Sequence, residues 1–382
     1  MVLTGEPSGD MHAGQLVKEI KKINHNICFS GIGGQHLEHQ GVELFYNIEN
    51  LSAMGLTEVI MQFKQIKKAF DLFKANLKNS KPDLLILVDY PGFNLKAAKF
   101  VKEHYQIKIL YYISPKVWAW NKSRLKKIKK FVDHAALILP FEEKIYKKAG
   151  IKATYVGNPL VDDYPEHLSK LFLKSHFKKD DLLKNKPLII GLLPGSRNNE
   201  VKNLFETMIK AAEQISTHLM HQQNKKVCFI VSKSDSIKKE YLKTILNKSG
   251  KSHLFEINDG SPRGIFLKAD LVIAASGTVT LEAALCCVPT IIIYKMSWLT
   301  YRIAKIVVKI QYAGLANLIV NKEIMPELLQ DNATCEKISK KAIYMLDHLT
   351  YFENQLQLVR KMLGNSGASL KTAQIAIKML CN

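Results

Sequence analysis

Short apolar runs alternate with amphipathic stretches along the chain. Leu84–Val88, Leu188–Leu192 and Leu271–Ala275 are continuous runs rich in Leu, Ile and Val. Met11–Ile23 and Asn203–His218 instead repeat their apolar residues with a helical period. Continuous apolar runs separated by helices are typical of parallel strands that are covered on both faces. The pattern therefore predicts an α/β chain built from βα units.

The length of the chain, 382 residues, indicates two domains of ordinary size. Asp162–Lys186 is rich in Lys, Asp and His and has no strand pattern, so we expect the boundary there. Both halves begin with a strand and a Gly-containing loop, Gly5–Gly14 and Pro194–Arg197, which indicates two doubly wound domains that face each other across a cleft. We expect a C-terminal helix to pack back on an N-terminal domain. The expected ranges are 1–165, 186–354 and, for that helix, about 355–382.

The formal charge of +21 favours polyanionic partners, namely nucleic acid, anionic lipid or phosphorylated substrates. The six cysteines form no CxxC pair and have no His at metal-ligand spacing, so we expect no metal, no cofactor and a reducing cytoplasm. We expect no signal peptide, because Met1–Leu3 leads directly into a Gly-rich turn. We expect no transmembrane helix, since Ser276–Thr278 and Pro289 interrupt the long apolar stretch 271–294. Without a Walker A or GxGxxG motif, a P-loop NTPase and a typical NAD enzyme are disfavoured.

In open α/β sheets, ligands bind beyond the carboxyl ends of the strands. In the first half, the glycines of Gly5–Gly14 allow close approach of the backbone, and the helix that follows favours an anion. The alternative is that Asp10 or Ser8 is a helix cap. Asp89 follows the apolar run 84–88 and could accept a proton from a hydroxyl, or it could cap the next turn as a structural residue.

The second half has two such loops. Arg197 suits a phosphate oxygen through forked hydrogen bonds, although it could be an ordinary surface arginine. The backbone N–H groups and hydroxyls of Ser276, Thr278 and Thr280 could cradle a diphosphate. Glu282 is the one charge in the stretch 271–294, and a buried carboxylate needs a partner, which could be the ribose of a nucleotide. The alternative is an ordinary helix carboxylate.

One amphipathic segment, residues 56–74, carries apolar residues on one helical face and lysines mostly elsewhere. Such a segment suits a membrane interface, but it could equally pack on its own sheet. The membrane-facing candidates are Val59, Ile60, Phe63 and Ile66.

Several segments span nearly the whole chain and carry a joint signal: Gly5–Asp10, Met54-Gly55 with Glu58-Val59, Ser114–Trp120, Leu193–Arg197, Ser276–Thr278 with Glu282, and Asn317-Leu318 with Pro326–Gln330. Together they resemble the lipid-A-disaccharide synthases. The resemblance implies a GT-B fold, in which two Rossmann-like domains bind the acceptor on the N-terminal side and the UDP-sugar on the C-terminal side. It also implies an inverting, metal-independent transfer from UDP-2,3-diacylglucosamine to 2,3-diacylglucosamine 1-phosphate. The products are a β-1,6-linked tetraacyl disaccharide 1-phosphate and UDP.

The resemblance assigns roles to individual residues. Asp89 is similar in position to the candidate general base that activates the acceptor 6-hydroxyl. Glu282 corresponds to a ribose ligand, and Glu327 and Gln330 to residues that line the nucleotide site from a partner chain. The implied UDP-binding residues are Arg197, Ser276, Gly277, Thr278, Glu282, Asn317, Glu327 and Gln330. The implied acceptor-side residues are Gly9, Asp10, His12 and Trp118.

The resemblance further implies a homodimer that exchanges C-terminal segments. The enzyme would bind peripherally to the anionic cytoplasmic face of the bacterial inner membrane, and its acyl substrates favour the membrane role of residues 56–74. Two other functions stay open. A nucleic-acid-binding protein would explain the charge but leave Asp89 and Glu282 without a function, so we expect no nucleic-acid partner. A lipid-carrier glycosyltransferase or a UDP-sugar epimerase would share the fold.

Overall fold

The computed structural model describes residues 1–51, 58–118, 123–165, 187–296, 301 and 311–381, and no side chains between residues 50 and 63. The chain divides into two compact units. Unit 1 comprises Met1–Asp162 and the C-terminal segment that begins at Asn365, and unit 2 comprises Asp163–Gly364. The segment that returns to the first unit thus begins at residue 365, compared with the expected start at about 355.

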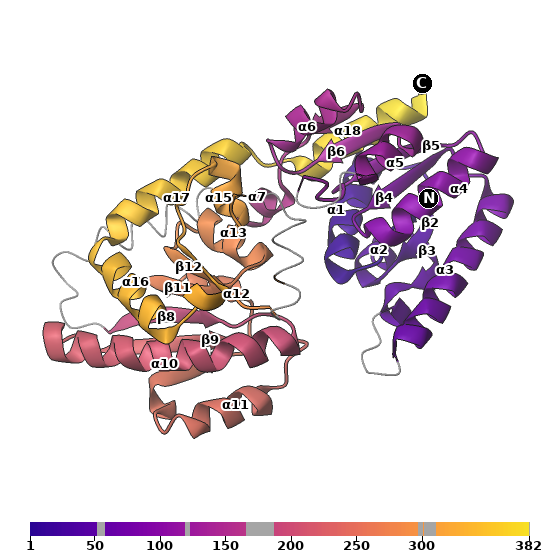
Figure 1. Cartoon of the computed structure of the whole chain (residues 1–382). Coiled ribbons are helices and arrows are strands. Elements are labelled where there is room, and N and C mark those ends of the chain that lie inside the picture. The colour runs from indigo at the N-terminus through magenta and orange to yellow at the C-terminus, as the bar shows by residue number, and fades with distance from the viewer. Residues whose placement is uncertain (52–57, 119–122, 166–186, 297–300, 302–310, 382) are drawn as a thin grey trace. The chain divides into compact units, whose positions relative to one another are not determined.

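Unit 1 is built on a sheet of parallel strands (Figure 1). Within the described residues its seven strands have the order β3-β2-β1-β4-β5-β6-β7. The apolar runs of the sequence form its centre, since every residue of Leu84–Val88 is buried. The strands are β1 (Val2–Leu3), β2 (Ser30–Gly33), β3 (Glu43–Asn47), β4 (Leu84–Val88), β5 (Lys108–Tyr112), β6 (His134–Leu137) and β7 (Ala153–Tyr155).

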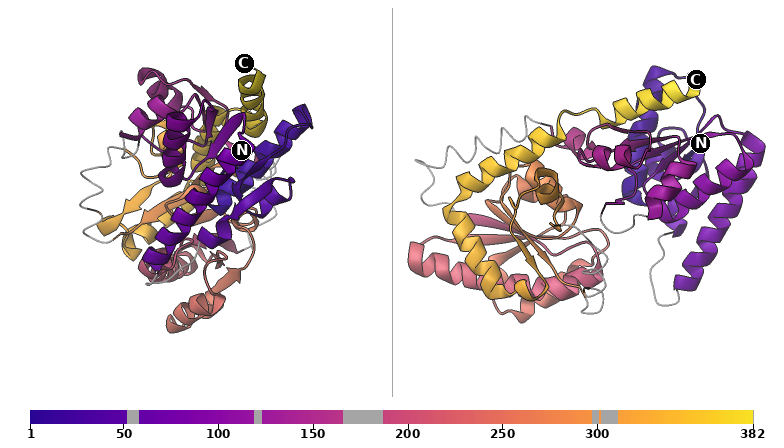
Figure 2. Two further views of the ribbon diagram at one scale, coloured as in Figure 1. Left: turned by 90° about the vertical axis from the view of Figure 1, so that its right-hand side faces the viewer. Right: turned by 45° about the horizontal axis from the view of Figure 1, so that its top comes forward.

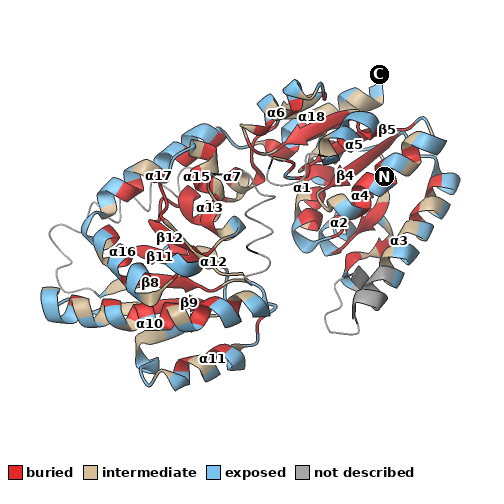
Figure 3. Ribbon diagram, in the orientation of Figure 1, coloured by how far each residue is buried: buried red, intermediate tan, exposed pale blue. Residues whose placement is uncertain are grey.

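The two faces of this sheet are covered by different helices, as alternation along β4 requires. Leu84, Ile86 and Val88 pack in one cluster with residues of α1 and α18, whereas Leu85 and Leu87 pack in another with residues of α3, α4 and α5. Figure 3 shows the buried strands between half-buried helices. The helices are α1 (Pro7–Ile23), α2 (Gln35–Glu38), η1 (Ile48–Leu51), α3 (Glu58–Ser80), α4 (Pro91–His104), α5 (Ser123–Phe131), α6 (Glu142–Lys148), α7 (Pro159–Asp163), which ends at the unit boundary, and α18 (Ala368–Cys381).

The C-terminal helix α18 belongs to unit 1 and lies along α1 (Figure 2). Ala373 and Ala376 are fully buried in the same cluster as Leu16 and Ile20 of α1. Small side chains on one helix let the two helix backbones approach closely. Because this contact joins the two ends of the chain, the first unit is complete only when the C-terminal helix is in place.

Unit 2 repeats the plan of unit 1. Within the described residues its six strands are parallel and have the order β10-β9-β8-β11-β12-β13. Helices α10 and α16 cover one face, and α12 and α13 lie on the other (Figure 1). The strands are β8 (Leu188–Leu193), β9 (Val227–Ser232), β10 (Phe255–Asn258), β11 (Leu271–Ala275), β12 (Thr290–Tyr294) and β13 (Glu327–Leu329). The helices are α10 (Asn198–Gln223), α11 (Lys239–Lys248), η2 (Ser252–Leu254), α12 (Pro262–Phe266), α13 (Thr278–Leu285), α15 (Leu315–Val320), η3 (Gln330–Asn332), α16 (Cys335–Asp347) and α17 (Leu349–Leu363).

The predicted α/β class with two parallel, doubly wound sheets is confirmed. In each sheet the chain order reverses between two central neighbours, β1 and β4 in unit 1 and β8 and β11 in unit 2. Ligands of such sheets bind outside the carboxyl ends of the strands at these switch points. The loops predicted to carry chemistry follow these four strands.

Candidate functional site

The Gly-rich loop after β1 is shaped by packing within unit 1. A Cβ at Gly5 would lie 2.1 Å from Cδ1 of Tyr90, and a Cβ at Gly9 would lie 2.4 Å from Oγ1 of Thr4. Gly5 therefore lets the loop lie against the Tyr90 ring, just after β4, and Gly9 lets the first turn of α1 lie against Thr4, just after β1. This contact accounts for Gly9 without a ligand, and its place on the acceptor side stays a prediction.

Asp10 is buried and caps a helix, although not its own. Its Oδ1 accepts a hydrogen bond from Gly34 N at 2.7 Å, and its Oδ2 accepts one from His36 N at 2.8 Å. These donors lie at the start of α2, so Asp10 stabilises that helix N-terminus. His12 is half-buried, and burial lowers the pKa of its imidazole to about 4, so the ring is neutral at pH 7. The acceptor-side role of both residues stays a prediction.

Asp89 lies directly after β4 in a left-handed backbone conformation, with a φ of +48°. Its carbonyl oxygen accepts hydrogen bonds from Asn94 Nδ2 at 2.7 Å and Tyr111 Oη at 2.8 Å. A non-glycine residue at positive φ is strained and persists where its surroundings hold it. These contacts fix the backbone at the position from which the carboxyl group extends.

The Asp89 carboxyl group lines a pocket of about 220 Å3 in unit 1. Burial raises the pKa of this carboxyl group, while the backbone N–H of Tyr90 and the ammonium group of Lys116 lower it. A carboxylate whose pKa is raised towards neutrality is a better general base. The pocket is lined by Asp89, Pro91, Ile113, Ser114, Pro115, Lys116, Arg124, Ile138, Leu139 and Glu142.

Glu142 of this pocket was not predicted. It is 1% exposed, and its carboxylate accepts hydrogen bonds from Trp118 Nε1 at 2.9 Å and Leu139 N at 3.1 Å. The sequence holds a signal for it, because Glu142 closely follows the apolar run that forms β6, as Asp89 follows β4. Trp118 is half-buried, and its hydrogen bond to Glu142 connects it to the pocket.

Arg197 projects from the loop after β8. Its side chain is 81% exposed, and Nη1 lies 3.9 Å from Oε1 of Glu200. Oε2 of Glu200 accepts hydrogen bonds from Ser196 N at 3.0 Å and Arg197 N at 3.3 Å, and Gly195 adopts a φ of +117°. The loop is thus rigidly held while the guanidinium group stays accessible to an anion.

The loop after β11 presents a short stretch of accessible backbone. Gly277 is exposed and has extended backbone at φ 175°, and in the described part of the chain no heavy atom beyond its sequence neighbours lies within 4 Å of where its Cβ would be. Thr278 is exposed at the start of α13, and Ser276 Oγ donates to Ala313 O at 3.4 Å. Packing within the described residues therefore does not require a glycine at 277, which leaves room for a ligand.

Glu282 lies in α13, the helix that follows this loop, and has a partner within the protein. Tyr164 Oη donates a hydrogen bond of 2.7 Å to Glu282 Oε2. Burial raises the pKa of Glu282, and the tyrosine hydroxyl partly offsets that effect. The partner expected from the isolated charge is therefore present within unit 2, and a ribose contact stays a prediction.

Asn317 and Glu327 bind each other. Asn317 Nδ2 donates to Glu327 Oε1 at 2.7 Å, and its Oδ1 accepts from Ile324 N and Met325 N, both at 2.9 Å. Glu327 also accepts from the backbone N–H groups of Ala313 and Gly314 at 2.7 and 2.9 Å. These contacts give both side chains a structural function, and their nucleotide contacts stay predictions.

The side-chain amide of Gln330 hydrogen-bonds both backbone groups of Met296. Its Oε1 accepts from Met296 N at 2.7 Å, and its Nε2 donates to Met296 O at 3.1 Å. These two hydrogen bonds join the segments that follow β12 and β13, so the side-chain amide is already bound within unit 2. No contact among the described residues tests the prediction that Gln330 lines the nucleotide site of a partner chain.

The membrane-facing candidates are only partly described. The side chains of Val59, Ile60 and Phe63 lie outside the described residues. Ile66 is half-buried and packs against the core cluster that contains Phe73 of the same helix. At Ile66, the apolar face of α3 thus packs on the sheet of its own unit. Among the described residues, no helix has the length and hydropathy needed to cross a membrane.

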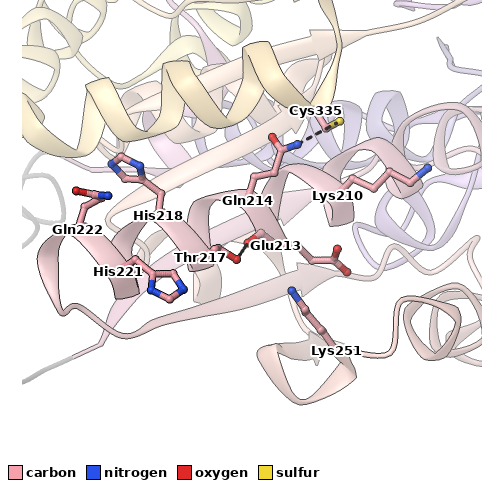
Figure 4. A pocket seen from close by; sticks show the side chains of 9 residues that line it. All are labelled: Lys210, Glu213, Gln214, Thr217, His218, His221, Gln222, Lys251 and Cys335. Atoms are coloured by element: carbon pink, nitrogen blue, oxygen red, sulfur yellow. Dashed lines mark hydrogen bonds between the residues drawn. The ribbon is translucent and has the colours of Figure 1, made fainter.

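A larger polar pocket lies along α10 (Figure 4). Gln214 Nε2 donates to Cys335 Sγ at 3.8 Å across it, and Lys210 and Lys251 contribute its cations. None of the predicted site residues lines this pocket. The two groups of candidate residues at the strand ends are therefore the stronger functional sites.

A sequence model of the lipid-A-disaccharide synthetase family matches residues 1–379. The chain belongs to the lipid-A-disaccharide synthase family. It is 36% identical to the lipid-A-disaccharide synthase of Geobacter metallireducens over 100% of this chain and 97% of that protein. It is 37% identical to lipid-A-disaccharide synthase 1 of Legionella pneumophila over 100% of this chain and 94% of that protein. The resemblance that the sequence motifs indicated is therefore confirmed.

Solved structures of the same fold are more distant in sequence. The UDP-GlcNAc 2-epimerase of Neisseria meningitidis superposes with a TM-score of 0.61 at 12% identity, covering 100% of this chain and 98% of that chain. MurG of Acinetobacter baumannii superposes with a TM-score of 0.61 at 15% identity, covering 99% of this chain and 98% of that chain. This member of the lipid-A-disaccharide synthase family has the GT-B fold and is a glycosyltransferase.

Proposed function

We propose that the protein transfers the sugar of UDP-2,3-diacylglucosamine to the 6-hydroxyl of 2,3-diacylglucosamine 1-phosphate. The products are the β-1,6-linked tetraacyl disaccharide 1-phosphate and UDP. The observation that carries the proposal is the family match over residues 1–379 together with the half-buried carboxyl group of Asp89 at the switch point of the first sheet. The same motifs that identified the family surround both switch points.

In the proposed reaction, Asp89 accepts the proton of the acceptor 6-hydroxyl while the hydroxyl oxygen attacks the anomeric carbon. The new C1–O6 bond forms as the bond from C1 to the UDP oxygen breaks, so the configuration at C1 inverts. One base and one anion-stabilising site are sufficient for this step. The raised pKa of Asp89 suits it for the first function.

Negative charge grows on the diphosphate of the departing UDP. We propose that the exposed guanidinium group of Arg197 and the backbone at Ser276, Gly277 and Thr278 stabilise that charge. Glu282, which Tyr164 holds in place, is the proposed ligand of the ribose hydroxyls.

The acyl chains of both substrates require access to a bilayer. We propose peripheral binding at the cytoplasmic face of the inner membrane, where the net charge of +21 favours anionic lipid. Each cation near such a surface contributes about 1 kcal/mol. The homodimer with exchanged C-terminal segments is also a proposal, and it rests on the family resemblance alone.

The test is an assay in detergent micelles that follows disaccharide and UDP from the two acylated substrates. Wild-type protein should form both products in equal amounts. Asp89→Asn should bind UDP normally and lose most of its turnover, whereas Asp83→Asn, at the amino end of the same strand, should stay active. Turnover of Asp89→Asn near the wild-type rate would remove Asp89 as the base. Epimerisation or hydrolysis of UDP-N-acetylglucosamine without an acyl acceptor would contradict the proposed reaction.

A further inference from the structure

Helix α6 contacts both ends of the loop 114–118, which forms one wall of the Asp89 pocket. At the start of the loop, Ser114 Oγ lies 2.6 Å from Tyr146 Oη. At its end, Trp118 Nε1 donates to Glu142 Oε1 at 2.9 Å. Glu142 and Tyr146 are four residues apart on α6, so they lie on the same face of the helix.

Both side chains of this pair are buried. Glu142 is 1% exposed and Tyr146 is fully buried. Burial raises the pKa of Glu142 to about 7, although Trp118, Leu139 and Lys116 all favour its charged form. A buried carboxyl group costs free energy unless its oxygens are satisfied. Here each oxygen accepts an N–H donor, Trp118 Nε1 on one and Leu139 N on the other.

This arrangement indicates a different function for Glu142 than for Asp89, although both residues line the same pocket. Glu142 is 1% exposed and its two oxygens already accept hydrogen bonds from Trp118 and Leu139, so it is less accessible to a substrate than the half-buried Asp89. The loop that it holds carries Lys116, an exposed cation that acts on the carboxyl groups of both Asp89 and Glu142. Glu142 is therefore suited to position the wall that faces Asp89.

We infer that Glu142 and Tyr146 are positioning residues, which clamp the loop 114–118 at both ends and thereby shape the pocket for the acceptor sugar. This inference rests on the proposed function, since it assigns the acceptor to the Asp89 pocket. The clamp acts within unit 1, whereas the proposed UDP ligands lie in unit 2. Loss of the clamp should thus affect the acceptor and leave the nucleotide unaffected.

The kinetic test compares Glu142→Gln and Tyr146→Phe with Glu143→Gln, an exposed carboxylate next to Glu142. Each clamp variant should raise the acceptor KM roughly tenfold, as expected for the loss of one buried hydrogen bond. The donor KM and the Kd for UDP should stay at the wild-type values. The double variant should resemble either single variant, because releasing one end already frees the loop. A rise in donor KM, an unchanged acceptor KM, or additive effects in the double variant would overturn the inference.

A second readout does not depend on turnover. The emission of Trp118, obtained by subtracting the spectrum of Trp118→Phe in each background, should change in Tyr146→Phe although Tyr146 binds the other end of the loop. Glu143→Gln should leave that emission unchanged. Emission that is insensitive to Tyr146→Phe would contradict the clamp even if the wild-type enzyme makes disaccharide. If the emission changes in Tyr146→Phe but the wild-type protein makes no disaccharide, the result would support the clamp and contradict the proposed function.

Discussion

Tyr164 and Glu282 are joined by a hydrogen bond of 2.7 Å across 118 positions of the chain. The Arg263 guanidinium lies 5.5 Å from the centre of the Tyr164 ring, and Arg360 Nη2 donates to the Tyr164 carbonyl oxygen. The tyrosine is thus held from both sides, and it holds the carboxylate beside the loop after β11. A carboxylate that is already oriented loses less entropy when it binds a ligand.

Tyr164→Phe should weaken UDP binding without unfolding unit 2. The change removes one hydroxyl from a buried carboxylate, so we expect a loss of affinity of roughly 3- to 10-fold. Titration calorimetry with UDP measures this effect. Tyr241→Phe, at a tyrosine that is 38% exposed, is the control and should bind UDP as the wild type does. Equal affinity of Tyr164→Phe and wild type would argue against Glu282 as a ribose ligand.

Gly277→Ala should fold normally and lose affinity for UDP. Among the described residues, the Cβ of an alanine would meet no atom within 4 Å apart from its sequence neighbours, and the φ of 175° suits any residue, so stability should change little. A methyl group in the space proposed for the diphosphate should lower affinity at least roughly tenfold, since hydrogen bonds to backbone N–H groups require close approach. Gly260→Ala, in an exposed loop of the same unit, provides the comparison. Unaltered UDP affinity would place the diphosphate elsewhere.

Asn317→Ala should destabilise unit 2. The change removes the hydrogen bonds that the fully buried Asn317 makes to Met325 O, Glu327 Oε1 and two backbone N–H groups. Leaving these groups unsatisfied should cost about 3 kcal/mol of unfolding free energy. Urea unfolding measures the effect, with Asn332→Ala at an exposed position as the control. A variant as stable as wild type but defective in turnover would indicate a direct catalytic function instead.

The Glu142 carboxyl group should make stability depend on pH. Burial raises its pKa from the ordinary 4.5 to about 7, so the folded state holds this proton over a range in which the unfolded chain has released it. The folded state therefore binds more protons between about pH 4.5 and 7. The free energy of unfolding falls as pH rises through that window, by up to about 3 kcal/mol, and the loss is complete above pH 7.

Glu142→Gln lacks this titration, which gives the measurement. The unfolding free energy of wild type minus that of Glu142→Gln should be more favourable to wild type at pH 5 than at pH 8. Lys116 is present in both proteins, and Tyr146 and Tyr155 do not titrate between pH 5 and 8, because burial raises the pKa of both hydroxyls above the ordinary 10. Parallel pH profiles for the two proteins would show that Glu142 is charged throughout this range.

Local patterns predicted the strands and the places where they end. The run Leu84–Val88 indicated a buried strand, and Asp89 therefore had to lie at the carboxyl edge of a parallel sheet. Arg197 and Ser276–Thr278 were located by the same rule. The rule succeeds because the carboxyl ends of parallel strands meet at one edge wherever those strands are in the chain.

The rule did not identify what each polar group binds. Asp10 was expected to cap its own helix or to face a ligand, yet it binds the start of α2, more than 20 residues away. Glu142 was missed because Pro140 and Phe141 separate it from the apolar run before it. Nothing in the local sequence indicates that Trp118 reaches its carboxylate.

The sequence by itself thus determined the α/β class, the order of strands and loops, and the family, because apolar periodicity and short motifs are local properties. The tertiary structure alone decided which polar side chains are engaged by the protein and which stay accessible. Some of these partners are far apart in the chain: Asp10 and Gly34 are separated by 24 positions, and Tyr164 and Glu282 by 118. Such pairs exist only after the sheets have packed against their helices, since packing brings the donors and acceptors together and removes the water that would otherwise satisfy them.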